Sequence, residues 1–318
     1  MNFYTAKQIA EKWNLSVQQI RKYCKEGKIK SAILYEGQWL IPENTKAPDV
    51  EEEERDLPLL KKLRYQMMRN NHYGIYEYIQ VNLAYSSNRM ASNRLTRKQV
   101  LEMYRTNRIT PAFEPTKVDD IFEVANHFLC VRYVIENALT PLSVDMIKHL
   151  HHLLTYGTIG DKRRKVAVGA FRSKVAKWGV PPEKINRELT QLLQNYEKKV
   201  VNYEKKSVNY EELSVDYELL FQLLVMILDF HVSFEKIHPF DDYNGRVGRV
   251  LMLKECLRLG IDPFVIDDKH RSDYNRGITQ WETDPEILQN TVRRARERFQ
   301  NEYETIRLFQ YHRDRTLL

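Results

Sequence analysis

The sequence is poor in cysteine and lacks any long apolar run. Its 318 residues include three cysteines, Cys24, Cys130 and Cys256, which show no paired spacing. That scarcity argues against a disulfide framework or a zinc site and fits a reducing compartment. No apolar stretch of about 18 residues occurs, and the start MNFYTAKQIAEKW has no basic stretch followed by an apolar leader. We therefore expect a cytoplasmic protein with no membrane partner.

The length and the charge of the chain say less about its domains and its partners. A chain of 318 residues is long enough for two or three domains, each with its own core. The chain has 50 Lys and Arg residues against 43 Asp and Glu residues, a net charge of +7. This excess supports a polyanionic partner only weakly.

Residues 238–249, HPFDDYNGRVGR, predict a loop that leads into a helix. Pro239 and the Asn-Gly pair interrupt regular structure. The preceding residues 219–230 are apolar nearly all round, as in a buried helix. The following residues 246–259 have helical spacing, which ends at Gly260. The motif therefore lies at the N-terminus of a helix.

This placement favours phosphate chemistry. The N-terminus of a helix offers unpaired N–H groups to an anion, and Arg246 and Arg249 share one helical face that can grip a polyphosphate. Asp242 is placed to hold Mg²⁺ against phosphates. The pKa of a histidine such as His238 suits a general base. The set predicts nucleotidyl or phosphoryl transfer to a hydroxyl, although any one of these residues would equally suit a polar loop between core helices.

The stretch resembles the signature of the Fic family, HxFx(D/E)GNGRxxR, at seven positions: His238, Phe240, Asp242, Asn244, Gly245, Arg246 and Arg249. Residues 230–237 resemble the stretch that precedes the motif in the family. Residues 271–278 resemble the family's segment that closes the nucleotide pocket. Residues 169–172 and 178–182 resemble its strand-like flap, which docks the target chain. The resemblance implies a mainly α fold, in which a helical Fic-type core carries a small β-hairpin flap.

The resemblance also implies AMP transfer from ATP to a Ser, Thr or Tyr hydroxyl on a target protein or on the chain itself. In that reaction His238 is the catalytic base and Asp242 binds Mg²⁺. The implied nucleotide-binding residues are Phe240, which anchors the loop, with Asn244, Gly245, Arg246, Arg249 and Tyr274. Tyr243 stands where the family usually has glycine. Its side chain could crowd the anion loop or lose a glycine-only backbone angle, which leaves the nucleotide's identity and orientation open.

Residues 85–96, YSSNRMASNRLT, resemble the inhibitory pattern (S/T)xxxE(G/N) found before the core of some Fic proteins. Ser87 matches, but Ala91 stands at the glutamate position and Ser92 at the Gly/Asn position. A capping box at Thr96 predicts the start of the next helix. Because alanine cannot pair with Arg249, we expect a de-repressed enzyme. The glutamate is either naturally absent or has been replaced, and the retained flanking pattern favours a replacement.

Residues 1–45 predict a separate module. Thr5 and Ser16 are placed to cap two short helices, and a hairpin is expected about Glu36-Gly37. The pattern resembles the winged helix-turn-helix of MerR-type and excisionase proteins, and residues 1–47 hold eight Lys and Arg against four Asp and Glu. In that arrangement a DNA groove would be read from the second helix by Gln18, Gln19, Arg21 and Lys22. The alternative is a small domain that binds protein.

The expected order continues with an acidic linker at 46–58, an N-terminal helical region at 59–118, the Fic core at 119–305 and a C-terminal tail at 306–318. Within the core, tyrosine recurs every seven residues at 196, 203, 210 and 217. This spacing predicts one face of a helix. The tyrosines either pack that helix against the core or are exposed sites of auto-modification.

Two functional classes remain open at the level of the sequence. The leading one is a protein adenylyltransferase that uses ATP and Mg²⁺ and modifies itself among other targets, with DNA and a second copy of the chain as further candidate partners. The alternative is a DNA-binding transcriptional regulator whose Fic core senses nucleotide without catalysis. The intact His238 and Asp242 argue against this alternative, and Tyr243 keeps it open. Removal of AMP, the reverse reaction, is disfavoured because it usually relies on the glutamate that is absent at position 91.

Overall fold

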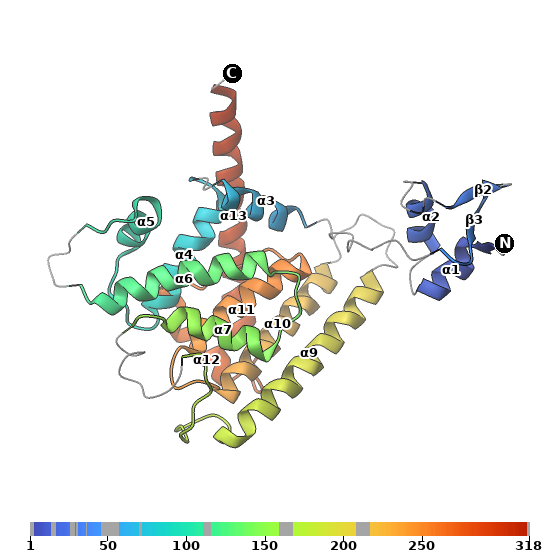
Figure 1. Cartoon of the computed structure of the whole chain (residues 1–318). Coiled ribbons are helices and arrows are strands. Elements are labelled where there is room, and N and C mark those ends of the chain that lie inside the picture. The colour runs from blue at the N-terminus through green and yellow to red at the C-terminus, as the bar shows by residue number, and fades with distance from the viewer. Residues whose placement is uncertain are drawn as a thin grey trace. The chain divides into compact units, whose positions relative to one another are not determined.

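The chain forms two compact units, Met1–Asp56 and Leu57–Leu318 (Figure 1). The computed structural model describes residues 3–13, 17–25, 29, 31–35, 37–45, 57–69, 72–110, 116–158, 168–207 and 217–316. Nearly all of the expected linker at 46–58 lies outside these residues. Its last position, Pro58, opens the first helix of the second unit.

The first unit combines two helices with a three-stranded antiparallel sheet. Its elements are β1 (Phe3–Thr5), α1 (Ala6–Trp13), α2 (Val17–Lys25), β2 (Ile33–Tyr35) and β3 (Gln38–Pro42), with strand order β1-β3-β2. Thr5 caps α1 as predicted, since its Oγ1 accepts from the backbone N of Gln8 at 3.4 Å. The predicted hairpin is present, whereas β1 is a strand that the sequence did not predict. The helices and the sheet are consistent with a helix-turn-helix module.

The second unit is helical. Its elements are α3 (Pro58–Met68), α4 (Ile75–Arg89), α5 (Arg97–Thr106), α6 (Val118–Glu136), α7 (Val144–Thr155), η1 (Pro182–Lys184), α9 (Ile185–Ser207), α10 (Tyr217–Ile237), α11 (Asn244–Leu259), η2 (Asp268–His270), α12 (Arg271–Thr279) and α13 (Glu286–Thr316). Helix α11 lies at the centre and contacts α4, α6, α7 and α10 (Figure 1). Every residue of α11 except Gly245 is buried. Helix α13 continues through the positions expected to form a separate tail.

The central helix is buried even though it carries charges in its C-terminal half. Lys254 donates to Glu255 at 2.7 Å, and Arg258 forms an ion pair with Glu197 of α9 at 2.5 Å. These pairs compensate the charges that burial would otherwise penalise. The helix ends at Gly260 in a left-handed conformation, with φ +71°, as predicted.

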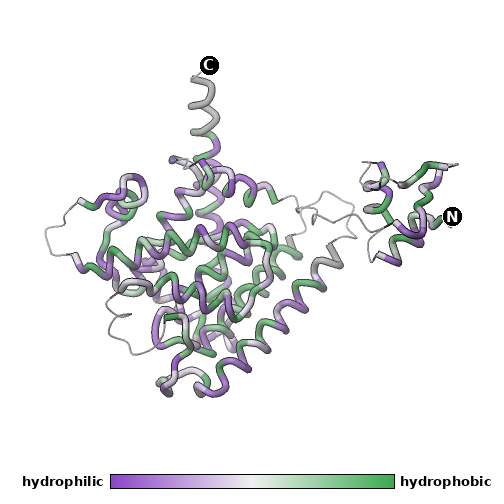
Figure 2. Tube along the Cα trace, in the orientation of Figure 1, coloured by the Kyte–Doolittle hydropathy of each residue, from purple (hydrophilic) through white to green (hydrophobic). Residues whose placement is uncertain are grey.

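The tyrosine repeat begins as a face that packs against the core. Tyr196 is buried against Phe230 with ring centroids 4.7 Å apart, Val200 is buried, and Tyr203 is half-buried. Figure 2 shows polar and apolar stretches alternating along α9, as expected for a helix with one buried face. Tyr196 is therefore inaccessible as a modification site, and the side chains of Tyr210 and Tyr217 lie outside the described residues.

No helix in the described part of the chain is both long and apolar enough to span a bilayer.

Candidate active site

The motif loop connects α10 to α11 and is closed by hydrogen bonds at both ends. The backbone N of His238 donates to Phe234 O at 3.1 Å, and that of Val247 donates to Tyr243 O at 2.9 Å. The side chain of Asn244 bridges the loop, because Oδ1 accepts from Phe240 N at 2.9 Å and Nδ2 donates to Phe240 O at 2.8 Å. The sequence predicted a break at Asn244, and the structure makes this residue the first of α11.

Asn244 also orients the imidazole of His238. Its Nδ2 lies 3.1 Å from His238 Nε2. The two bonds to Phe240 fix Nδ2 as the donor, so Nε2 accepts and the ring proton of the neutral histidine sits on Nδ1. His238 is half-buried, and its pKa is lowered by that burial and by the nearby charge of Arg172. The residue is thus a neutral base at neutral pH, with a lone pair at Nε2.

Phe240 supports the loop from inside the core. Its ring is fully buried and stacks on His151 of α7, with centroids 3.9 Å apart. We expected Phe240 among the nucleotide-binding residues, but a fully buried ring cannot touch a ligand. Its contribution is the anchoring that the sequence analysis also assigned to it.

Arg172 ties the flap segment to the motif loop, and the sequence did not single it out. It is buried, and its Nε donates to His238 O at 2.7 Å, its Nη1 to Lys174 O at 2.9 Å and its Nη2 to Val180 O. Its backbone N donates to Pro239 O at 3.0 Å. One guanidinium therefore satisfies carbonyls from both segments and fixes the backbone that carries the base.

The described part of the flap is irregular and contains no strand. Residues 168–181 have no regular secondary structure, so the expected hairpin does not form there. Arg172 occupies carbonyls that a second strand would need, and Gly179 has φ +101°. A Cβ at Gly179 would lie 2.8 Å from both Arg172 Nη2 and His238 Cβ, so only glycine allows this close approach.

Tyr243, at the position where the family signature has glycine, has a backbone conformation that favours glycine. It caps α11 with φ +66° and ψ 4°, a left-handed conformation that costs roughly 1 kcal/mol without glycine. Its side chain turns toward α6, where the buried phenol donates to Glu123 Oε1 at 2.9 Å. Burial raises the pKa of Tyr243. The glycine-only angle is therefore retained, and the ring is accommodated in the protein interior.

The first motif arginine, Arg246, is held by two carboxylates. Its Nη1 donates to Glu123 Oε1 at 2.7 Å and its Nη2 lies 3.5 Å from Asp242 Oδ1. Its guanidinium carbon lies 3.3 Å from the centroid of the Tyr243 ring. The half-exposed Asp242 also accepts from the backbone N of Tyr243 at 2.7 Å. No sequence pattern links Glu123 to the motif more than 100 residues later.

The second motif arginine, Arg249, contacts the region expected to be inhibitory. Its Nε donates to Ser87 Oγ at 3.0 Å and its Nη2 to Ser87 O at 3.1 Å. Gly245 leaves room for this side chain, since a Cβ there would lie 3.0 Å from Arg249 Nη1. Ala91 is exposed in the turn after α4, and Ser92 has φ +71°, an angle that favours Gly or Asn. Ser87, the first residue of the inhibitory pattern, is thus in direct contact with Arg249.

Buried titratable groups surround Arg249. Burial and the charge of Arg249 lower the pKa of His127 and of His231 to about 3, so both are neutral at pH 7. His231 Nε2 lies 2.6 Å from the hydroxyl of Tyr274 on α12. Burial raises the pKa of Glu235 to about 7, against the opposing effect of Arg249. Arg249 is therefore the permanent cation of a buried cluster, of which the sequence singled out Arg249 and Tyr274 alone.

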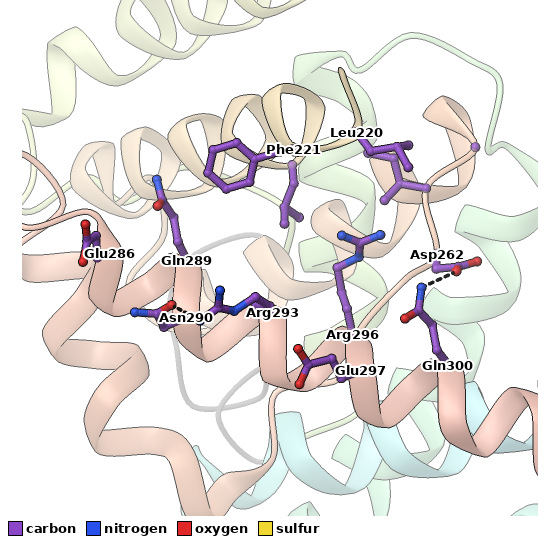
Figure 3. Close-up of a pocket in the computed structure, with 13 residues that line it drawn as sticks. Leu220, Phe221, Asp262, Glu286, Gln289, Asn290, Arg293, Arg296, Glu297 and Gln300 are labelled. Carbon is purple, nitrogen blue, oxygen red and sulfur yellow. Dashed lines mark hydrogen bonds between the residues drawn. The ribbon is translucent and has the colours of Figure 1, made fainter. Parts of the chain in front are cut away.

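The other expected site residues lie on α2. Arg21 is exposed there, and the side chains of Gln18, Gln19 and Lys22 lie outside the described residues. A cavity of about 850 Å³ lies elsewhere, between the start of α10 and α13, where Arg293 and Arg296 face Leu220 and Phe221 (Figure 3). None of the motif residues lines it. The candidate site is thus defined by its side chains and its helix N-terminus, and not by this cavity.

Residues 141–256 match the family model of the Fic/DOC family, so the chain contains a Fic/DOC domain. Solved structures share the fold. A Fic domain containing signaling protein from Bacteroides thetaiotaomicron is 17% identical with a TM-score of 0.57, over 79% of this chain and 92% of that chain. Fic-1 from C. elegans, residues 134–508, is 17% identical with a TM-score of 0.56, over 79% and 72%.

A Fic family protein from Desulfovibrio desulfuricans is 20% identical with a TM-score of 0.51, over 78% of this chain and 73% of that chain. No curated protein matches the chain. At these identities the likeness to the solved structures establishes a shared fold and no more.

Proposed function

We propose that the chain is a protein adenylyltransferase, which moves AMP from ATP to a hydroxyl of a protein, itself included. The observation that carries the proposal is the neutral His238, whose Nε2 is oriented by Asn244 at the N-terminus of the helix that carries Arg249, with Asp242 close enough to act on it electrostatically. Fic/DOC domains commonly transfer AMP to proteins, which agrees with this arrangement.

In the proposed reaction, the acceptor hydroxyl displaces Asn244 Nδ2 from His238 Nε2, and Nε2 then takes the hydroxyl proton. The hydroxyl oxygen then attacks the α-phosphorus, and pyrophosphate leaves. The backbone N–H groups at the start of α11 stabilise the negative charge of the phosphates. Arg249 binds the outer phosphate once it exchanges Ser87 for the ligand. Arg246, balanced by Glu123, holds Asp242 in place.

The residues present fit a magnesium ion. The described residues contain no group of three or more His, Cys, Asp or Glu side chains that could hold a metal ion. Mg²⁺ is usually bound by one or two carboxylates together with substrate phosphates, and not by a protein cage. The half-exposed Asp242 supplies one such carboxylate. When bound, the ion would neutralise phosphate charge beside His238.

We further propose that the enzyme is de-repressed. The end of α4 reaches Arg249 through Ser87, and position 91 lies one helical turn farther along the chain. A glutamate there would compete with the outer phosphate for Arg249, whereas alanine carries no charge. This proposal favours forward AMP transfer over AMP removal.

A second candidate function rests on the N-terminal unit. Two short helices and a small antiparallel sheet, with Arg21 exposed on α2, suit a winged helix-turn-helix that binds DNA. Under this proposal an Arg21→Ala variant loses affinity for DNA and still transfers AMP. Under the regulator alternative, DNA binding persists while no transfer is measured. A homodimer is a further expectation, to be tested by sedimentation.

Auto-modification with α-labelled ATP and Mg²⁺ tests the leading proposal. The full chain should acquire label, and a His238→Ala variant should not. Label from γ-labelled ATP in place of α-labelled ATP would instead indicate phosphoryl transfer. If the full chain binds ATP but acquires label from neither α-labelled nor γ-labelled ATP, the nucleotide-sensing regulator would be favoured.

A further inference from the structure

An exposed tryptophan stands beside the candidate base. Trp178 is 62% exposed, and its ring centroid lies 6.4 Å from that of His238 with the ring planes at 87°. Val175, on the same segment, is 82% exposed. Neither side chain is needed for the core, and large apolar side chains exposed together often mark a binding surface.

The backbone of Trp178 is held in place. The next residue, Gly179, has φ +101° and lies directly over Arg172 and His238, where no side chain would fit. The backbone N of Val180 donates to Ile237 O at 3.3 Å, and Arg172 holds the carbonyl of Val180. The backbone that carries the indole is therefore held next to His238 before any acceptor binds, which lowers the entropic cost of binding.

The chemistry of the base also distinguishes between acceptors. Burial and Arg172 lower the pKa of His238, so it is a weaker base than an ordinary histidine. A tyrosine hydroxyl, with a pKa of about 10, gives up its proton far more readily than an aliphatic hydroxyl. A weak base is thus better matched to a phenol than to serine or threonine.

We infer that Trp178 makes this enzyme selective for tyrosine as the acceptor side chain, by packing against the phenol ring while its oxygen reaches His238. The inference rests on the proposed function and narrows its substrate class. The phenol proton moves to His238 Nε2, a bond forms between the phenol oxygen and the α-phosphorus, and the bond from that phosphorus to pyrophosphate breaks. Exposed Lys174 and Lys177 on the same segment favour acidic residues around the tyrosine.

Three acidic peptides that differ only in carrying Tyr, Ser or Thr test the inference, with α-labelled ATP and the full chain. The tyrosine peptide should have the highest kcat/KM. Because an aromatic pair contributes about 0.5–1.5 kcal/mol, Trp178→Ala should lower kcat/KM for the tyrosine peptide by about two- to tenfold. It should leave the Ser and Thr peptides unchanged, and Trp178→Phe should restore most of the loss. Phe309→Ala, which removes an exposed aromatic ring on α13, is the matched control.

Equal transfer to all three peptides, or a tyrosine preference that survives in Trp178→Ala, would overturn the inference and leave AMP transfer intact. If the wild-type chain transfers AMP to no peptide and not to itself, the proposed function fails and the inference fails with it. The two failures are therefore distinguishable.

Discussion

Replacing Glu123 by alanine tests the contact that holds the motif loop against α6. Glu123 Oε1 accepts from Arg246 at 2.7 Å and from Tyr243 at 2.9 Å, and Oε2 accepts from Asn93 at 3.0 Å. The side chains of Arg246 and Glu123 are only 5% and 14% exposed. The substitution leaves a buried guanidinium whose nearest remaining carboxylate, Asp242, is 3.5 Å away.

The expected cost follows from this burial. Removing one partner of a buried ion pair typically costs about 3–5 kcal/mol, because the other charge is left uncompensated. Asp242 compensates in part, so we expect a loss near the lower end, about 3 kcal/mol. For a domain of roughly this size, each kcal/mol moves the melting temperature by about 2–4 °C. Glu123→Ala should therefore lower Tm by about 6–12 °C.

Thermal unfolding followed by circular dichroism measures this shift. The matched control is Glu136→Ala on the same helix, whose ion pair with Arg132 at 2.9 Å is 62% and 44% exposed. An exposed pair contributes about 0.3–0.5 kcal/mol, so the control should move Tm by no more than about 2 °C. If Glu123→Ala melts within that same margin of the wild type, the reasoning on the buried pair is refuted.

Three further predictions follow from the same geometry. Ala91→Glu should lower the rate of auto-modification at least about tenfold, because a charge-assisted bond to Arg249 is worth about 1.5–3 kcal/mol; an unchanged rate would contradict the inhibitory role of position 91. Glu235→Gln should gain stability over the wild type between pH 5 and pH 8. Burial raises the pKa of Glu235 from 4.5 to about 7. The contribution of neutral Glu235 to the stability of the folded wild type is therefore fully present below pH 4.5 and is lost as the pH rises through 7. A difference in Tm between Glu235→Gln and the wild type that is independent of pH would contradict the raised pKa of Glu235. Finally, because burial and Arg172 lower the pKa of His238, the acidic limb of kcat/KM should fall below pH 6.5; a limb above that value would show that another group titrates.

Features encoded locally were predicted from the sequence. Proline and Asn-Gly interrupt the chain between two segments of helical periodicity, and the structure places the motif loop there. The capping box at Thr96 and Gln99 is present in both directions and starts α5. The left-handed angle at Ser92 is one that favours the Gly or Asn usual at this position of the family pattern. Short-range hydrogen bonds and periodicity determine the position of the motif loop and the capping box.

Features that depend on distant segments were not predicted. Glu123 is one acidic residue on an ordinary helix until α6 brings it to Arg246, and nothing nearby in the sequence signals that pairing. Arg172 lies in a recognised segment, but its role follows from carbonyls supplied by three separate residues. The expected hairpin was wrong for residues 168–181, where Arg172 holds the backbone by bonds to these carbonyls and no strand forms. Tyr243 shows that a side chain can keep a glycine angle when the interior accepts its ring.

The proposal of AMP transfer is tested most directly by intact-mass spectrometry of the chain after incubation with ATP and Mg²⁺. The account predicts that the wild-type chain gains the mass of one or more AMP groups and that His238→Ala gains none. A gain of phosphoryl mass in its place, or the same AMP gain in His238→Ala, would contradict the role assigned to His238.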